Sequence, residues 1–453
     1  MQKLTTSNRV LDCSLASILR ITIPLILTFL SNSLLYSIDR WMLAGYNLDA
    51  MNAVVLSGTL VCAFTLIPVG IAGVAEIYVG QYNGAQEYHK LAAPVWQMLY
   101  FSGYSILFFL PAAYFSEFLN LLPAYYFQEG VDYQRFLLYF GFLPSVIVSL
   151  SSFFIGQGRA NIVTVVVLMG FLVNVVLDYL LIYGYKDSLP SMGVRGAAIA
   201  TILAEIAQVG VLALVFFNKE NRTFYKTFKN RQYDKSLFLG CIKIGIPLSA
   251  SNLAVMFSWY LVQCLVSHVS KEMATIYGIG LTIYMLFAFV GEGLNKAMAT
   301  LSANMIGQKD LPSIQKTFRM FIAFSFILGG LIAIPLLGYP EKILAFFDLL
   351  KNTEVGEQEI RMTFSLLTIG IILEALTFSL WGILVSGGDA RYPTIVYQTC
   401  LWSCLVLPTA LLYIIGQLNS VTIVYEMNIV CLFLSFFFLY RRYKSLVWFH
   451  KII

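Results

Sequence analysis

Ile23-Pro24-Leu25 recurs in this chain as Ile246-Pro247-Leu248, at an offset of 223 in the numbering (247 − 24). Asn83-Gly84-Ala85-Gln86 recurs more loosely as Ile306-Gly307-Gln308-Lys309 at the same offset (307 − 84). Each copy is built from long apolar stretches, so the sequence predicts two homologous lobes within a membrane. In transporters of this design the substrate site lies between or within the lobes, near the bilayer midplane.

The composition independently indicates a membrane protein. Of the 453 residues, 59% are hydrophobic and only 12% are charged, and the mean hydropathy is +0.77. A soluble domain carries about a quarter charged residues. The net charge of +5 is small and gives no indication of nucleic-acid binding.

Twelve stretches are long and apolar enough to cross a bilayer, which takes about 20 residues of helix. We therefore expect an all-α integral membrane fold with twelve transmembrane helices in two pseudo-symmetric six-helix lobes. In the first lobe the predicted spans are 18–43, 53–80, 93–115, 134–155, 161–184 and 194–217. In the second lobe they are 240–267, 274–303, 317–338, 361–386, 393–416 and 420–440.

The charged loops predict domain boundaries and orientation. We expect an N-terminal lobe over 1–218, a linker over 219–239, a C-terminal lobe over 240–441 and a tail over 442–453. The basic residues of the linker are Lys219, Arg222, Lys226, Lys229, Arg231 and Lys235. Short loops rich in Lys and Arg stay cytoplasmic, so an even number of spans places both termini there as well. The acid-rich loop 341–361 is then external.

Ionisable side chains within the spans are the candidate site residues, because each is costly in hydrocarbon. Asp39 and Asp178 lie late in spans 1 and 5, with Asn174 on the same helical face as Asp178. Thr201 in span 6 shares that depth, and Glu205 lies one turn deeper. This all-oxygen set suits Na⁺. It equally suits a proton, since two adjacent carboxylates in low dielectric cannot both stay ionised. A structural polar network between helices is the alternative.

The second lobe supplies further charged candidates within its predicted spans. Glu292 and Lys296 are four residues apart, the spacing of a self-neutralised pair. Both a structural pair and a substrate or coupling role remain open for them. Glu374 lies near the middle of span 10 with no base on its own helix, so it either carries a proton or binds a cation. Glu76 and Glu426 lie nearer span ends, where we expect water or headgroups to solvate them.

Aromatic and proline residues supply further candidates. Ring faces attract organic cations, so the aromatic candidates for a substrate cavity are Tyr36, Phe154, Trp259, Tyr260, Tyr284 and Trp381. Pro24 and Pro247 are the candidate hinges, because proline removes a backbone hydrogen bond and permits a helix to bend.

Six stretches succeed one another along the chain in an order that a known family shares. They are Ile23-Pro24-Leu25, Asp39-Arg40-Trp41-Met42-Leu43-Ala44-Gly45, Gly80-Gln81-Tyr82-Asn83-Gly84-Ala85, Asn174-Val175-Val176-Leu177-Asp178, Gly193-Val194-Arg195-Gly196-Ala197-Ala198-Ile199-Ala200-Thr201 and Gly387-Gly388-Asp389-Ala390-Arg391. Together they resemble the multidrug and toxic compound extrusion (MATE) family over essentially the whole chain. The resemblance implies a cation-coupled antiporter that exports bulky, often cationic organic compounds as H⁺ or Na⁺ enters. We accordingly expect no cofactor, a monomer in contact with membrane lipid, and a place in the bacterial inner membrane.

The resemblance also assigns roles to positions. Asp39, Asn174, Asp178 and Thr201 each fall on the matching motif position of the family's first-lobe acid site. Glu374 matches an acid that some bacterial members carry in span 10. Those members also carry a glutamate eight residues after the span 7 proline, where this chain has Val255. We therefore expect coupling to run through the first lobe.

Two other classes of protein compete with an antiporter. A flippase for a lipid-linked saccharide or lipid favours a cationic cavity, and here Lys296 is the one candidate base within the spans while acids dominate. A membrane enzyme such as a polyprenyl transferase needs paired Asp-rich motifs or a His/Glu metal set, and the sequence contains neither DxxD nor HExxH. We expect no enzymatic activity.

Overall fold

The computed structural model describes residues 11–119, 127–185, 190–340, 342 and 357–449. Within these residues, eleven helices are long and apolar enough to cross a membrane. A bent pair of helices brings the number of spans to twelve if it counts as one. The predicted all-α membrane fold is therefore confirmed.

The first bundle contains six spans, with the second and fourth each divided into two helices. Its helices are α1 (Leu15–Tyr46), α2 (Leu48–Ala72), α3 (Ala75–Gly84), α4 (Ala92–Tyr114), α6 (Phe127–Tyr139), α7 (Leu143–Gly156), α8 (Ala160–Tyr183) and α9 (Gly193–Phe216). Short helices η2 (Tyr88–Lys90) and α5 (Ser116–Leu119) lie at either end of α4. Pro24 and Pro68 lie inside α1 and α2.

The second bundle repeats this pattern. Its helices are α11 (Lys235–Val269), α12 (Lys271–Gln308), α13 (Leu311–Gly338), α15 (Glu357–Ser386), α16 (Arg391–Leu401), the π-helical η5 (Trp402–Val406), α17 (Leu407–Ile414) and α18 (Val421–Lys444). Side-chain caps set several helix starts. Asp234 accepts from the Ser236 and Leu237 amides at the start of α11, and Ser270 accepts from the Met273 amide at the start of α12.

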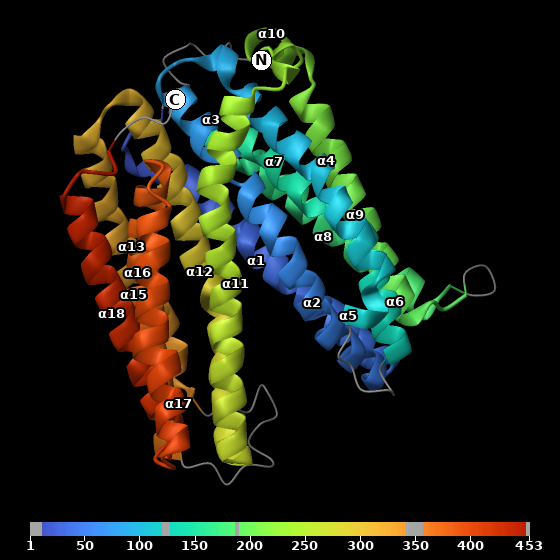
Figure 1. Cartoon of the computed structure of the whole chain (residues 1–453), viewed down its shortest axis with the longest axis vertical. Helices are drawn as coiled ribbons and strands as arrows, with labels where there is room; N and C mark the ends of the chain where they lie inside the picture. Colours follow the sequence, from blue (N-terminus) through green and yellow to red (C-terminus); the bar gives the residue numbers. More distant parts are fainter. Residues whose placement is uncertain (1–10, 120–126, 186–189, 341, 343–356, 450–453) are drawn as a thin grey trace.

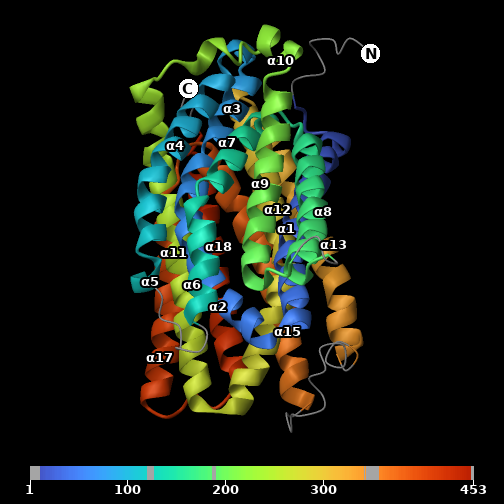
Figure 2. The same cartoon turned by 90° about the vertical axis from the view of Figure 1, so that its right-hand side faces the viewer.

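The two bundles form a V (Figure 1). They meet at the end where α1 begins, α18 ends and α10 (Lys219–Phe224) joins them, and they diverge towards the opposite end. Figure 2, turned by 90°, again places α10 and α3 at one end and α17 at the other. η3 (Lys229–Arg231) lies with α10 in the connection between the bundles.

The sequence repeat coincides with the crossing of the two bundles. A Cβ atom on Gly84 would lie 1.8 Å from the Asn304 carbonyl oxygen, and one on Gly307 would lie 2.1 Å from the Gln81 carbonyl oxygen. Gly307 is the repeat counterpart of Gly84, and Asn304 is that of Gln81, because both pairs differ by the offset of the repeat (307 − 84 = 304 − 81). Gly84 thus contacts Asn304, and Gly307 contacts Gln81, which is the counterpart of Asn304 in the other repeat. A contact with two-fold symmetry requires this exchange of partners. The absence of side chains at both glycines lets the α3 and α12 backbones touch.

Local differences from the predicted spans have physical causes. The predicted span 134–155 is broken by a 43° bend between Tyr139 and Leu143. A Cβ on Gly141 in this bend would lie 2.5 Å from the Phe109 ring, so only glycine admits the ring there. α11 begins at Lys235, inside the predicted linker 219–239, because Asp234 caps it. Most of the acid-rich loop 341–361 lies outside the described residues.

Candidate coupling and substrate sites

The first bundle brings Asp39, Asn174 and Asp178 together. α1 runs from the end where the bundles meet towards the end where they diverge (Figure 1). Asp39 lies late in α1, and its exposed fraction is 6%. Asn174 and Asp178 occupy one face of α8, and both are fully buried. The carboxyl groups of Asp39 and Asp178 are close enough to interact directly. Two acids with one amide between them therefore share a dry site.

The Asn174 amide bridges the two acids. With its nitrogen facing them, it donates to Asp39 Oδ1 (3.0 Å) and to Asp178 Oδ2 (3.0 Å). The other end of the amide lies 3.5 Å from Thr201 Oγ1, whose hydroxyl donates to the Ala197 carbonyl (3.1 Å). The other carboxylate oxygen of Asp178, Oδ1, is buried and has no hydrogen-bond partner among the described residues. This oxygen is a ready acceptor for a proton or a small cation.

The composition of the site limits the metals that it can hold. Across the described ranges, no three His, Cys, Asp or Glu side chains are grouped to bind a metal ion. Two carboxylates, an amide oxygen and a hydroxyl suit a weakly bound monovalent cation better than a transition metal. Turned over, the Asn174 amide would present its oxygen to such a cation.

Contacts between α1 and α8 fix the site from both sides. The Tyr183 hydroxyl donates to the Met42 carbonyl (2.6 Å), just beyond Asp39. At the opposite end of α1, the Thr164 hydroxyl lies 2.8 Å from the Pro24 carbonyl oxygen and 2.9 Å from the Thr28 hydroxyl. Two threonines thus brace the predicted hinge at Pro24. Glu205 on α9 is half-buried and makes no hydrogen bond or ion pair within the described part of the chain.

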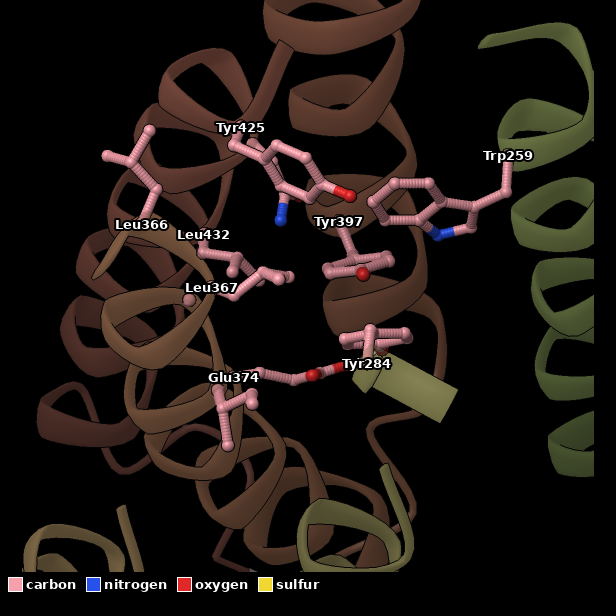
Figure 3. Close-up of a pocket in the computed structure, with 11 residues that line it drawn as sticks. Trp259, Tyr284, Leu366, Leu367, Glu374, Tyr397, Tyr425 and Leu432 are labelled. Carbon is pink, nitrogen blue, oxygen red and sulfur yellow. Dashed lines mark hydrogen bonds between the residues drawn. The ribbon is translucent and has the colours of Figure 1, made fainter. Parts of the chain in front are cut away.

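The second bundle holds a narrow aromatic pocket around Glu374 (Figure 3). Its lining residues are Trp259, Tyr284, Leu366, Leu367, Gly370, Ile371, Glu374, Tyr397, Tyr425, Asn428 and Leu432. Tyr284 points its hydroxyl at Glu374 and donates to Oε1 at 2.5 Å. The ring of Tyr284 stacks on Trp259, with centroids 6.1 Å apart. A carboxylate flanked by ring faces can attract a positively charged group.

The other aromatic candidates lie elsewhere. Trp381 packs edge-on against Tyr397, behind the pocket lining. Phe154 is fully buried in the core of the first bundle, and Tyr260 is 62% exposed. The side chain of Tyr36 is outside the described part of the structure. Of the six aromatic candidates, Trp259 and Tyr284 therefore line this pocket.

The structure corrects the predicted pairing of Lys296. The side-chain nitrogen of Lys296 lies 2.6 Å from Glu76 Oε2, so its direct partner is Glu76 in the other bundle and not Glu292. Glu292 is exposed. Glu76 was expected to be solvated near a span end, but its side chain is only 4% exposed. The span formed by α2 and α3 ends at Gly84, beyond the predicted boundary at 80, so Glu76 lies farther from the end of the span than the prediction implied.

Two features of the sequence could have indicated this contact. Glu76, Gly80, Asn83 and Gly84 follow the i, i+4, i+7, i+8 spacing of one helical face. Lys296, Thr300, Asn304 and Gly307 follow a comparable spacing in the second lobe. Polar residues and glycines on matching faces of repeat-related helices mark surfaces that pack closely. The pocket residues Tyr397 and Tyr425 carried no such signal, because aromatic residues make up 15% of the chain, and Asn428 has no charge that would have marked it.

Comparisons with known proteins agree on one family. The family model described as MatE matches residues 24–180 and 247–412, two ranges whose first residues differ by the offset of the sequence repeat. The probable multidrug resistance protein YoeA of Bacillus subtilis is 23% identical over 404 residues, covering 84% of this chain and 83% of that protein. The probable multidrug resistance protein NorM of Thermotoga maritima is 21% identical over 374 residues, covering 81% of this chain and 78% of that protein.

Solved structures share the fold. A MOP superfamily transporter from Pyrococcus furiosus, described as having a binding pocket of reverse polarity, matches with a TM-score of 0.87 at 17% identity. That match covers 98% of this chain and 99% of the other. An outward-facing multidrug resistance MATE transporter matches with a TM-score of 0.84 at 16% identity, covering 95% and 96% of the two chains. At such identities the structural likeness is evidence for the fold alone.

Proposed function

Since this chain belongs to the MatE family of multidrug efflux transporters, we propose that it is an antiporter that exchanges H⁺ or Na⁺ for organic cations. The observation that carries this proposal is the buried site of the first bundle. Two acids meet there around one amide, and Asp178 Oδ1 lacks a partner among the described residues. An acid pair in low dielectric requires a cation to balance its charge. Binding of the coupling ion supplies this cation, and its release leaves the acids charged again.

Coupling requires that the site bind its cation with different affinities in the two states of the protein. A cation bound at Asp39 and Asp178 neutralises the first bundle and removes its attraction for a cationic substrate. Its release towards the cytosol restores that attraction. The membrane potential contributes about 2.3 kcal/mol per charge per 100 mV, which drives such a cycle in one direction.

The bridging amide of Asn174 suits either coupling ion. With its nitrogen towards the acids, it stabilises the pair that a single proton neutralises. Turned over, it adds an oxygen to those of Asp39 and Asp178, as Na⁺ requires. Thr201 Oγ1, near the other end of the amide, accommodates either orientation. Separate H⁺ and Na⁺ gradients in a transport experiment distinguish the two ions.

Substrate recognition is proposed for the second bundle. Glu374 supplies the negative charge, and Trp259 and Tyr284 supply ring faces beside it. The pocket has room for a group about the size of one water molecule. It therefore receives the charged end of a substrate whose apolar body lies between the bundles.

The charge distribution supports an orientation. The basic segment 219–231 lies at the end where the bundles meet, and we place that end in the cytosol. The diverging end then faces outward. In the alternate state of the transporter, the outward end is closed and the cytosolic end is open, with Pro24 and Pro247 as hinges. We place the protein, as a monomer, in the bacterial inner membrane.

A lipid-linked saccharide is a weaker candidate substrate. Its pyrophosphate would need a free base between the bundles, and Lys296 is already paired with Glu76. The acids of both bundles would repel the same group.

Transport in proteoliposomes tests the proposal. Vesicles containing purified protein and ethidium, a fluorescent organic cation, are given a proton gradient or a Na⁺ gradient separately. We expect efflux with one of the two gradients, and we expect Asp39→Asn and Asp178→Asn to abolish it. Asp132→Asn is the matched control, because Asp132 forms an ion pair with Arg195 (2.7 Å) outside the site. Equal efflux by all three variants would contradict the proposed coupling site.

A further inference from the structure

A charged contact joins the two bundles where they meet. Lys296 Nζ on α12 lies 2.6 Å from Glu76 Oε2 on α3. On the same carboxylate, Oε1 accepts a hydrogen bond from the Thr300 hydroxyl at 2.7 Å. The Glu76 side chain is 4% exposed and that of Lys296 is 30% exposed. The acid is thus the buried member of the pair, and the base lies at the edge of the contact.

Further contacts surround this pair and oppose sliding of one bundle along the other. The Asn83 amide donates to Asn304 Oδ1 (2.7 Å), and the Gln81 amide donates to the Ser386 carbonyl (2.8 Å). Gly84 and Gly307 hold the two backbones in direct contact. A sideways shift would drive these groups into one another, so the bundles can part here only by moving directly away from each other.

Parting of the bundles would leave Glu76 without a partner. Lys296 and Thr300 both lie on α12, one turn apart, so they would leave the carboxylate together. In the described part of the chain, these two residues are the only hydrogen-bond and ion-pair partners of the Glu76 carboxylate. An acid that was buried against a cation and then loses it must recruit another.

Lys296, in contrast, has a replacement on its own helix. Glu292 lies four residues earlier on α12 and is exposed. At this spacing an ammonium and a carboxylate face each other across one helical turn. Parting of the bundles would therefore leave Lys296 compensated and Glu76 vacant.

We propose that Glu76 is a binding site for the positively charged group of a cytosolic organic cation, and that Lys296 occupies this site while the bundles are in contact. The inference rests on one part of the proposed function, namely that the bundles part at this end. Lys296 and the cargo then compete for one carboxylate. Return of Lys296 on closure displaces the cargo towards the opposite side of the membrane, so that a substrate is released by an internal cation of the same charge.

Equilibrium binding of ethidium to the full-length protein in lipid nanodiscs, without any gradient, tests this inference. Lys296→Met keeps the length of the side chain but removes the competing charge, and we expect it to tighten ethidium binding at least tenfold. Glu76→Gln should abolish that gain in the double variant Glu76→Gln/Lys296→Met. The double variant removes both charges together and is expected to fold, since replacing both members of a buried pair is often neutral for stability.

The pattern of affinities decides whether the Glu76 carboxylate binds the cation. A gain in Lys296→Met that is lost in the double variant supports a cation site at Glu76. Equal affinities in both variants overturn it, because a merely structural pair would respond to the loss of Lys296 whether or not Glu76 is charged. If Lys296→Met takes up a proton but binds ethidium no more tightly than the wild-type protein, the inference is also overturned. If gradient-driven efflux by the wild-type protein persists in either of those cases, the proposed function stands without this site.

Discussion

Replacing Gly84 by alanine tests whether the contact between α3 and α12 holds the bundles together at this end. The added Cβ would lie 1.8 Å from the Asn304 carbonyl oxygen, whereas Cβ contacts under 3.0 Å essentially never occur. The two backbones must therefore part by about 1.2 Å (3.0 − 1.8) at the crossing. Overpacking of this kind costs about 1–3 kcal/mol. Because that cost falls only on the state in which the bundles touch, the equilibrium should move about 5- to 150-fold towards the parted state.

Spin labels measure this shift directly. Lys90 follows Gly84 in the first bundle and Lys316 follows Gly307 in the second, and both are exposed, so cysteines there can carry nitroxide labels. We expect the Gly84→Ala variant to add a longer distance to the distribution between the labels. Gly210→Ala is the matched control, because a Cβ at Gly210 meets nothing within 4 Å. Identical distributions for the two variants would refute the reasoning.

Three other changes address the remaining contacts. Thr164→Val removes a donor to the Pro24 carbonyl on another helix, and we expect it to cost about 1 kcal/mol of stability. The thermal stability in detergent should fall by more than in Thr59→Val, whose hydroxyl bonds only its own helix. Tyr284→Phe keeps the ring but removes a hydrogen bond that stabilises the charged form of Glu374, worth about 1.5–3 kcal/mol, so we expect the affinity for a primary alkylammonium ion, whose charged end is small enough for the pocket, to fall about tenfold or more; unchanged affinity would exclude the pocket as a recognition site. Asn174→Leu removes the amide that bridges the two acids, and gradient-driven efflux should fall at least tenfold, whereas efflux at the wild-type rate would mean that the amide has no part in coupling.

The twelve spans and the two lobes were predictable because their signals are local or periodic. Hydrocarbon thickness fixes the length of each apolar stretch, and the constant offset between matching motifs fixes the repeat. The proximity of Asn174 to Asp178 follows from helical spacing alone. Their approach to Asp39 was inferred from matching depths in the membrane, and the structure places the three together.

The features that the sequence did not predict depend on contacts between distant segments. Helical spacing favoured Glu292 as the partner of Lys296, but the nearer acid in space is Glu76, in the other half of the chain. Such a pair becomes visible only once the packing of the bundles is known. The bend after Tyr139 likewise depends on where the Phe109 ring lies against Gly141. Local spacing cannot show either contact.

The central claim is that Asp39 and Asp178 exchange a coupling cation for cargo, and thermodynamic linkage between the two ligands measures it most directly. Ethidium affinity of the purified protein is recorded at increasing proton concentration and, separately, at increasing Na⁺ concentration. We expect one of these cations to weaken ethidium binding at least fivefold in the wild-type protein, because coupled sites must affect each other reciprocally. The effect should vanish when both aspartates are replaced by asparagine. Weakening of the same size in that double variant would contradict the claim.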